Sequence, residues 1–176
     1  MDKYVTKKAT KIKAILTDVD GVLTDGKLYY DKDGEITKTF SVKDGQLIKF
    51  FKEKGFKIGF ISGRADKCVL NRSKHLKIDY YAGGSKDKIK DLEKFIDMFN
   101  ISIEEICYIG DDLIDLGVLK KVGLSICPID AIDIVKDNVD YVSQLKGGEG
   151  VLRNAIDIIL KSQDLYIELL NKKEII

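Results

Sequence analysis

Short apolar runs alternate along this chain with longer stretches of helical pattern. The runs predict strands near residues 12–18, 56–62, 78–82, 106–110 and 124–127, and the longer stretches predict helices near 44–54, 66–76, 86–99, 113–121 and 130–137. The first run is short, bounded and β-branched, which is typical of a central strand whose two faces are covered. This alternation of strands and helices predicts an α/β fold built on a doubly wound, Rossmann-like parallel sheet.

Residues 27–41 break this alternation. Residues 27–40 resemble two short strands joined by a turn with an Asp-Gly pair, which predicts a β-hairpin inserted after the first strand. The hairpin has more apolar side chains than a lone exposed hairpin normally carries, namely Leu28, Tyr29, Tyr30, Ile36 and Phe40. Either it packs on its own domain or it joins subunits, and we favour the second. No other segment is long enough to form a cap domain.

The length and composition suit one domain. A chain of 176 residues with 44% apolar content can form one core and is too short for two ordinary domains, so residues 1–176 are expected to fold together. The lysine-rich segment 3–13 is expected to be a solvated end. The tail from about residue 162 to 176 contains an amphipathic segment, 165–170, that suits docking as a helix on this domain or on a partner.

Two carboxylates follow the first apolar strand. Asp18 and Asp20 come just before Gly21, after the run 14–17. Two like charges in one small volume repel each other unless a cation neutralises them. Carboxylate and carbonyl oxygens favour a hard cation, so we expect Mg2+ at this place. Taken alone, Asp-x-Asp-Gly is equally typical of a solvated turn.

Polar groups also follow later strands. Ser62-Gly63-Arg64 ends the second strand, and its hydroxyl and backbone amides are suited to hold a phosphate at a helix start. Lys86, Lys88 and Lys90 lie at the start of the helical stretch 86–99, and Gly110-Asp111-Asp112-x-x-Asp115 follows the strand near 106–110. Ligands bind at the carboxyl ends of the strands in a doubly wound sheet, and all these groups fall there.

In this order, the motifs resemble those of the haloacid dehalogenase-like phosphatases: Asp18-x-Asp20, Ser62, Lys88 and Gly110-Asp111-Asp112-x-x-Asp115. The resemblance spans the globular part of the chain. Three segments are similar to the small capless branch of that family typified by phosphatases of 3-deoxy-D-manno-octulosonate 8-phosphate. They are residues 18–26, Val42-Lys43-Asp44-Gly45 and Gly147-Gly148-Glu149-Gly150.

The resemblance implies a Mg2+-dependent phosphomonoesterase. It implies that Mg2+ binds Asp18, the carbonyl of Asp20, and Asp111, because a phosphate dianion and an anionic nucleophile need a cation between them. Asp18 would attack phosphorus and form an aspartyl-phosphate, while Asp20 would protonate the leaving alkoxide and then activate water. Ser62 and Lys88 would hold the phosphoryl oxygens.

Some of these assignments have alternatives. Lys88 matches the family spacing better than Lys86 or Lys90, and any of the three also suits a solvated helix face. Asp112 is expected to orient the metal shell or Lys88, as carboxylates behind a metal site do. Both Asp112 and Asp115 are also suited to capping the helix that follows Gly110, and Asp115 is the weaker candidate for a role in the site.

The resemblance also implies a homotetramer, joined through the hairpin, in which a neighbouring subunit covers the site. The expected substrate is 3-deoxy-D-manno-octulosonate 8-phosphate, in lipopolysaccharide precursor synthesis, and a nine-carbon ulosonate 9-phosphate is the alternative. The candidates for binding this sugar-acid phosphate are Gly63, Arg64, Arg72 and the loop 147–150 with Arg153, because an arginine binds both oxygens of a carboxylate. Each arginine alone is also typical of a surface charge.

Other classes of protein fit less well. A net charge of +1 gives no overall field for nucleic acid. The three cysteines, odd in number and widely spaced, favour free thiols. Without an apolar run of membrane-spanning length or a signal-peptide pattern, we expect a cytoplasmic protein with no membrane partner. A receiver domain would need an aspartate where Ser62 stands. A catalytically silent assembly module is a further alternative, although it could lose Asp18 or Asp111, and both are present.

Overall fold

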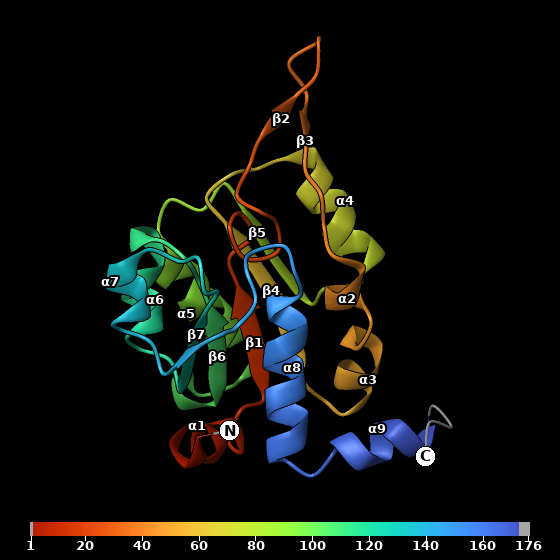
Figure 1. The fold of residues 1–176 in the computed structure, drawn as a ribbon, viewed down its shortest axis with the longest axis vertical. Coiled ribbons are helices and arrows are strands. Elements are labelled where there is room, and N and C mark those ends of the chain that lie inside the picture. Colours follow the sequence, from red (N-terminus) through yellow and green to blue (C-terminus); the bar gives the residue numbers. More distant parts are fainter. Residues whose placement is uncertain (1, 173–176) are drawn as a thin grey trace.

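A six-stranded parallel sheet forms the centre of the molecule in the computed structural model, which describes residues 2–172 (Figure 1). The strand order is β5-β4-β1-β6-β7-β8, and every neighbouring pair is parallel. The strands are β1 (Ala14–Thr17), β4 (Lys57–Ser62), β5 (Tyr80–Gly83), β6 (Ile106–Ile109), β7 (Leu124–Cys127) and β8 (Tyr141–Val142). The predicted doubly wound fold is confirmed, with β8 as an additional edge strand.

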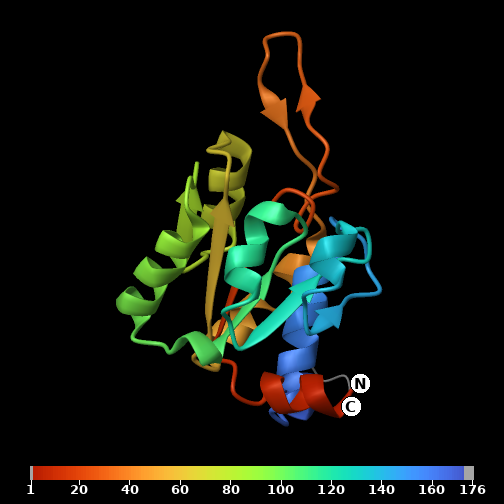
Figure 2. The same ribbon diagram turned by 90° about the vertical axis from the view of Figure 1, so that its left-hand side faces the viewer.

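Helices cover both faces of the sheet, as Figures 1 and 2 show. One layer contains α1 (Lys3–Ala9), α2 (Val42–Gly45), α3 (Ile48–Glu53), α4 (Lys67–His75) and α8 (Val151–Ser162), with α9 (Tyr166–Lys172) beside it. The other layer contains α5 (Lys88–Phe99), α6 (Leu116–Leu119) and α7 (Asp133–Lys136). Two short 3-10 helices, η1 (Ile103–Glu105) and η2 (Leu113–Asp115), flank β6.

The central strand β1 explains the continuous apolar run in the sequence. Ile15 packs into the core on the face of α8, while Ala14 and Leu16 pack into the core on the face of α5. All three side chains are fully buried. Because both faces are covered, no position in this strand can be polar without an internal partner. Thr17 has one, since its hydroxyl donates to the Asp18 carbonyl at 2.7 Å.

The helix α8 was missed in the sequence analysis, although its apolar side chains recur at helical spacing. Leu152, Ile156 and Ile159 are fully buried in the core. The helix begins after Gly150, and the Arg153 N–H donates to Asp44 Oδ1 at 3.0 Å. The segment Val42-Lys43-Asp44-Gly45 therefore provides a carboxylate for the first turn of α8, where an anion is favourable.

Both ends of the described chain form helices that pack against the core. The segment 3–13 is not a solvated end, because it contains α1, whose Val5 and Ala9 are buried in the core. The amphipathic segment 165–170 docks on its own domain through α9, with Leu169 buried there. Residues 173–176 of the expected tail lie outside the described residues. No helix among residues 2–172 has the length and apolar character needed to cross a membrane.

Three predicted helices are shorter or divided in the structure. The stretch 44–54 forms α2 and α3, which are separated at Gln46 and Leu47. The stretch 113–121 begins with the 3-10 turn η2 before α6, because carboxylates from residues 112 and 115 bind the amides of that turn. In place of the helix expected at 130–137, α7 has a single turn at residues 133–136.

The β-hairpin is present as predicted and extends away from the body of the molecule (Figure 2). It consists of β2 (Tyr29–Tyr30) and β3 (Ile36–Thr37), and the Tyr30 side chain is exposed. Phe40 differs from the expectation, because its ring packs against the core and lies 5.8 Å from the guanidinium of Arg72. The strand β2 thus exposes the two tyrosine rings of the hairpin, whereas Phe40 at the hairpin base packs against the core.

Candidate active site

The candidate site lies where the carboxyl ends of β4, β1 and β6 meet. Asp18 directly follows β1, and its N–H donates to the Ile109 carbonyl at 2.8 Å. Asp111 follows β6 after Gly110, and the buried Ser62 is the last residue of β4. Because β1 lies between β4 and β6, these three side chains stand at one edge of the sheet.

Three carboxylates and one ammonium group form the centre of the site. Asp18, Asp111 and Asp115 offer oxygens that all lie within 4.8 Å of one another. The Lys88 Nζ lies 2.9 Å from Asp18 Oδ1 and 2.7 Å from Asp115 Oδ1, and the side chains of Lys88 and its two partners are almost completely buried. The cluster therefore has more negative than positive charge in a place that water reaches poorly.

The pKa values show this imbalance. Burial raises the pKa of Asp18 to about 6, with the charge of Asp115 acting in the same direction and Lys88 acting against it. Burial, followed by the charges of Asp18 and Asp115, raises the pKa of Asp111 to about 8. Burial alone would lower the pKa of Lys88, but the two carboxylates outweigh it and raise that pKa. One lysine is therefore too little positive charge for three carboxylates.

Asp115 already has a full set of hydrogen-bond donors. Its Oδ1 accepts from Lys88 and from the Tyr108 hydroxyl, both at 2.7 Å. Its Oδ2 accepts from the backbone N–H groups of Asp111 at 3.1 Å and Asp112 at 3.3 Å. These four donors leave little capacity for a metal ion, so we assign Asp115 to holding Lys88 and the turn that carries Asp111.

The other carboxylates of the cluster fit a divalent cation. Among the described residues, Asp111 Oδ1 is buried and has no hydrogen-bond partner. Gly21 leaves the space that Asp111 occupies, because a Cβ at residue 21 would lie 2.1 Å from Asp111 Oδ2. Hard oxygen donors, excess negative charge and an unsatisfied oxygen are what Mg2+ requires. Asp18 and Asp111 are thus the side chains in the cluster best able to bind it.

Asp112 has a different place from the one expected. It is exposed, and its Oδ1 accepts from the Leu113 N–H at 2.6 Å, so it caps η2. The contact with Lys88 belongs to Asp115 instead, because the 3-10 turn brings residue 115 under the end of β6. The sequence analysis weighed both carboxylates and favoured the wrong one for this contact.

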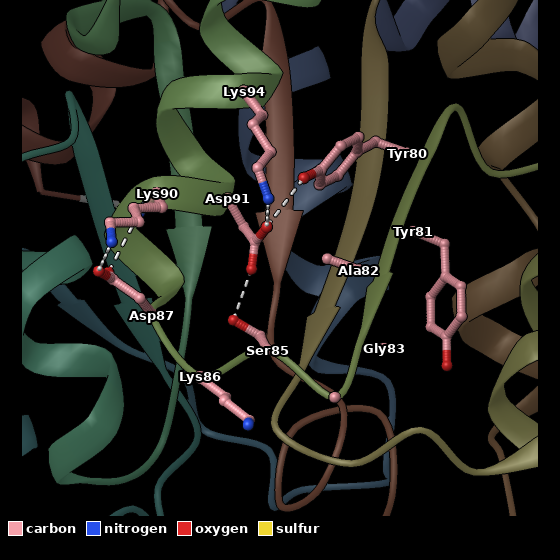
Figure 3. A pocket seen from close by; sticks show the side chains of 11 residues that line it. Tyr80, Tyr81, Ala82, Gly83, Ser85, Lys86, Asp87, Lys90, Asp91 and Lys94 are labelled. Atoms are coloured by element: carbon pink, nitrogen blue, oxygen red, sulfur yellow. Dashed lines mark hydrogen bonds and ion pairs between the residues drawn. The ribbon is translucent and has the colours of Figure 1, made fainter.

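Lys88 is brought to the cluster, whereas Lys86 and Lys90 are exposed beside a separate surface pocket (Figure 3). The Asp91 carboxylate, at the edge of that pocket, accepts from the Ser85 hydroxyl at 2.6 Å, from the Tyr80 hydroxyl at 3.3 Å and from the Lys94 ammonium at 2.9 Å. These bonds tie the start of α5 to β5. They fix the loop and the helix turn from which Lys88 reaches the site.

A second charged group lies beside the cluster. The Asp20 carboxylate pairs with Lys38, whose Nζ lies 2.5 Å from Asp20 Oδ1 and 2.6 Å from Asp66 Oδ2. Asp66 also accepts from Arg64 Nε at 2.9 Å. Burial would lower the pKa of Lys38, but the two carboxylates raise it, so this lysine stays charged. The sequence analysis missed Lys38 and Asp66, because no local pattern distinguishes a hairpin lysine that folds back onto the domain.

The residues that the sequence analysis proposed for substrate binding lie in two different places. Arg64 is half-exposed next to Asp66, and Gly63 is exposed in the same turn, where the Arg64 N–H donates to Ser62 Oγ at 3.1 Å. Arg72 points to the base of the hairpin and donates to the Ser41 carbonyl at 3.1 Å. The structure therefore places Arg64 in the charged group around Asp20, and it gives Arg72 contacts in a different place.

The loop 147–150 packs against the turn that follows β1. The Gly148 N–H donates to the Val22 carbonyl at 3.0 Å, and a Cβ at Gly147 would lie 2.1 Å from the Gly21 carbonyl oxygen. This close approach explains why the loop is rich in glycine. Arg153, expected near the leaving group, pairs instead with Asp157 through Nε at 2.9 Å.

Comparison with known proteins agrees with this geometry. Residues 82–154 match the family model described as haloacid dehalogenase-like hydrolase. The chain is 36% identical over 160 residues to 3-deoxy-D-manno-octulosonate 8-phosphate phosphatase of Salmonella typhi, covering 91% of this chain and 85% of that protein. The fold and site thus define a haloacid dehalogenase-like hydrolase. Within that class, the chain belongs to the capless family of 3-deoxy-D-manno-octulosonate 8-phosphate phosphatases, and the resemblance noted in the sequence is confirmed.

Solved structures give the same result. One is the crystal structure of 3-deoxy-D-manno-octulosonate 8-phosphate phosphatase from Moraxella catarrhalis in complex with magnesium ion, phosphate ion and KDO molecule. It matches this chain with a TM-score of 0.94 and 31% sequence identity, and the match covers 98% of this chain and 99% of that one. The cobalt-bound form from Haemophilus influenzae has a TM-score of 0.86 and 37% identity, covering 89% of this chain and 92% of that one.

The stability of the metal-free protein should depend on pH through Asp18 and Asp111 of this cluster and through the buried Asp44 beside α8. The pKa values of Asp18, Asp111 and Asp44, about 6, 8 and 6, lie above the ordinary value near 3.8. Between about pH 5 and pH 8, the folded protein therefore holds protons that the unfolded chain has released, so the free energy of unfolding should fall as pH rises.

Denaturant unfolding in excess chelator measures this slope. Asp111→Asn should flatten it, because the amide does not ionise, whereas the control Asp137→Asn, at an exposed position, should leave it unchanged. Mg2+ should restore stability at the upper end of the range for the wild type and for Asp137→Asn but not for Asp111→Asn, because it binds the folded state through Asp111. An unchanged slope in Asp111→Asn would contradict the charge imbalance described here.

Proposed function

We propose that this protein is a Mg2+-dependent phosphomonoesterase that hydrolyses 3-deoxy-D-manno-octulosonate 8-phosphate to the free sugar acid and phosphate. The observation that carries the proposal is the buried cluster in which Asp18 contacts Lys88, while Asp111 Oδ1 has no hydrogen-bond partner within residues 2–172. The matched relatives support the choice of substrate, because they are phosphatases of this sugar phosphate.

Asp18 is the proposed nucleophile. It lies at the end of the central strand, where the backbone fixes its position, and Lys88 holds one of its carboxylate oxygens. In the proposed reaction, a carboxylate oxygen of Asp18 attacks phosphorus and forms an aspartyl-phosphate. Mg2+, bound to Asp18, Asp111 and the Asp20 carbonyl, would neutralise the charge between nucleophile and phosphate. Lys88 would then hold a phosphoryl oxygen together with Ser62.

Asp20 is the proposed acid and base. Its carboxylate pairs with Lys38, whereas the Asp18 carboxylate pairs with Lys88. The proposed acid and the proposed nucleophile therefore have separate lysine partners. In its protonated form, Asp20 would donate its proton to the leaving alkoxide oxygen as the phosphorus–oxygen bond breaks, which leaves Asp20 as a carboxylate. It then takes a proton from the water that cleaves the aspartyl-phosphate. Arg64, half-exposed in the same charged group, is the proposed contact for the substrate carboxylate.

Assembly and location belong to the same proposal. The exposed Tyr29 and Tyr30 on a hairpin that leaves the domain support a homotetramer joined through the hairpins, with a neighbouring subunit covering the site. The three free cysteines, two of them buried, support a reducing, cytoplasmic location. A nine-carbon ulosonate 9-phosphate is the second candidate substrate, because the same groups would bind its phosphate and carboxylate.

Asp18→Asn should abolish phosphate release, because the amide keeps the shape of the side chain without its nucleophilic anion. We expect a loss of at least ~10³-fold in kcat/KM with Mg2+ present. The control Asp97→Asn, exposed on α5, should keep wild-type turnover. The assay compares the eight-carbon 8-phosphate with the nine-carbon 9-phosphate, and the better wild-type substrate identifies the sugar. A well-folded Asp18→Asn enzyme with wild-type turnover would exclude this mechanism.

Tyr30→Glu should reduce the molecular mass measured by light scattering, because burying a charge at a subunit interface without a partner is unfavourable. The smaller species should still hydrolyse a small generic phosphoester but lose efficiency with the sugar-acid phosphate. The control Tyr4→Glu changes an exposed tyrosine on α1 and should leave the mass unchanged. If Tyr30→Glu gives monomers with full sugar-acid phosphatase activity, the neighbouring subunit does not cover the site.

A further inference from the structure

Lys38 joins three segments that are separate in the sequence. Its side chain has no exposed area, and its ammonium lies within 2.6 Å of the carboxylates of Asp20 and Asp66. It stands at the base of the hairpin, directly after β3, while Asp20 follows β1 and Asp66 precedes α4. A buried ammonium is strongly unfavourable unless its partners hold it in good geometry. The pairing therefore fixes the position of Asp20 relative to the domain.

Asp66 pairs with Lys38 instead of capping the helix α4 that follows it. It is the residue before the first turn of α4, where an aspartate normally accepts from the helix amides, yet its carboxylate makes no such bond. It accepts instead from Lys38 at 2.6 Å and from Arg64 at 2.9 Å. The local preference for a cap is overridden, so the arrangement Asp20–Lys38–Asp66 is a built feature of the site.

We propose that Lys38 is a positioning residue that holds the Asp20 carboxylate in the orientation required for proton transfer to the leaving group, with Asp66 as its anchor. The proposal rests on the phosphatase function proposed above. Asp20 is only partly buried, with 24% of its side chain exposed, and Lys38 is its ion-pair partner. Without Lys38, the Asp20 side chain would be free to rotate toward solvent.

This role affects one half of the reaction selectively. With an alkyl phosphate, the phosphorus–oxygen bond breaks as Asp20, in its protonated form, gives its proton to the alkoxide oxygen and Asp18 receives the phosphoryl group. A para-nitrophenolate leaves without a proton at neutral pH. The parameter kcat/KM covers the steps up to release of this first product, so it should sense the position of Asp20 only for the alkyl ester.

The test compares Lys38→Met, Lys38→Arg and Asp66→Asn with the wild type, each as the Mg2+-loaded enzyme. Met keeps most of the length of the lysine without its charge, and Arg keeps the charge. Asp66→Asn removes the anchor and leaves the Lys38–Asp20 pair, so it provides the test if Lys38→Met does not fold. The matched control is Lys67→Met, because Lys67 is an exposed lysine that pairs with Glu35 of the same hairpin.

For the sugar-acid phosphate, Lys38→Met should lower kcat/KM by ~10²-fold, with a smaller loss in Asp66→Asn and partial recovery in Lys38→Arg. For para-nitrophenyl phosphate, kcat/KM should stay within a few-fold of wild type. The variant should instead show a burst of nitrophenolate, with kcat and KM lowered together, because Asp20 no longer activates water efficiently. Lys67→Met should behave as wild type with both esters.

Two results would overturn the proposal. An equal loss of kcat/KM with both esters would mean that Lys38 supports the fold or phosphate binding rather than Asp20, and an unchanged kcat/KM with the sugar-acid phosphate would mean that Asp20 needs no such support. A wild-type enzyme inactive with both esters would instead reject the phosphatase function, and the role of Lys38 with it. The failure of the inference and the failure of the function are therefore distinguishable.

Discussion

The excess of negative charge at the end of the central strand is the constraint on which the site depends. Asp18, Asp111 and Asp115 crowd around one ammonium, that of Lys88, in an almost dry place. Such an arrangement is unfavourable in isolation and raises the pKa values of Asp18 and Asp111. It is maintained because β1, β6 and α5 are held by the rest of the fold. The cluster thus lowers the stability of the metal-free fold and at the same time forms a site that attracts a cation.

The charged side chains of the site form two separate groups of ion pairs. In the proposed mechanism the cluster around Asp18 would bind the phosphoryl group, while Asp20 pairs with Lys38 in a separate group that also contains Asp66 and Arg64. Asp18 and Asp20 stand just before a turn that Gly21 makes possible with a φ of 86°. Because Lys38 stands at the hairpin base, the same segment that extends toward solvent also supplies the lysine that pairs with Asp20 and Asp66.

Much of this could be predicted from the sequence, since buried strands are continuously apolar and their polar ends are conspicuous. The parallel sheet, the hairpin and the gathering of Asp18 and Asp111 follow from that pattern, whereas the choice of Lys88 among three nearby lysines rests on the family resemblance. The contact between Lys88 and Asp115 does not follow from the pattern, because the choice between two nearby carboxylates depends on one 3-10 turn. The local sequence pattern does not predict the burial of Lys38 either, because that burial depends on how the hairpin base folds back onto the domain.

Proton release on Mg2+ binding tests the central claim most directly. If Asp111 has a pKa near 8 in the metal-free protein, Mg2+ bound at pH 7 must displace its proton. Calorimetric titration in buffers of different ionisation enthalpy counts the protons released. Our account predicts close to one proton per Mg2+ in the wild type and much less in Asp111→Asn. Mg2+ binding with no proton release in the wild type would contradict it.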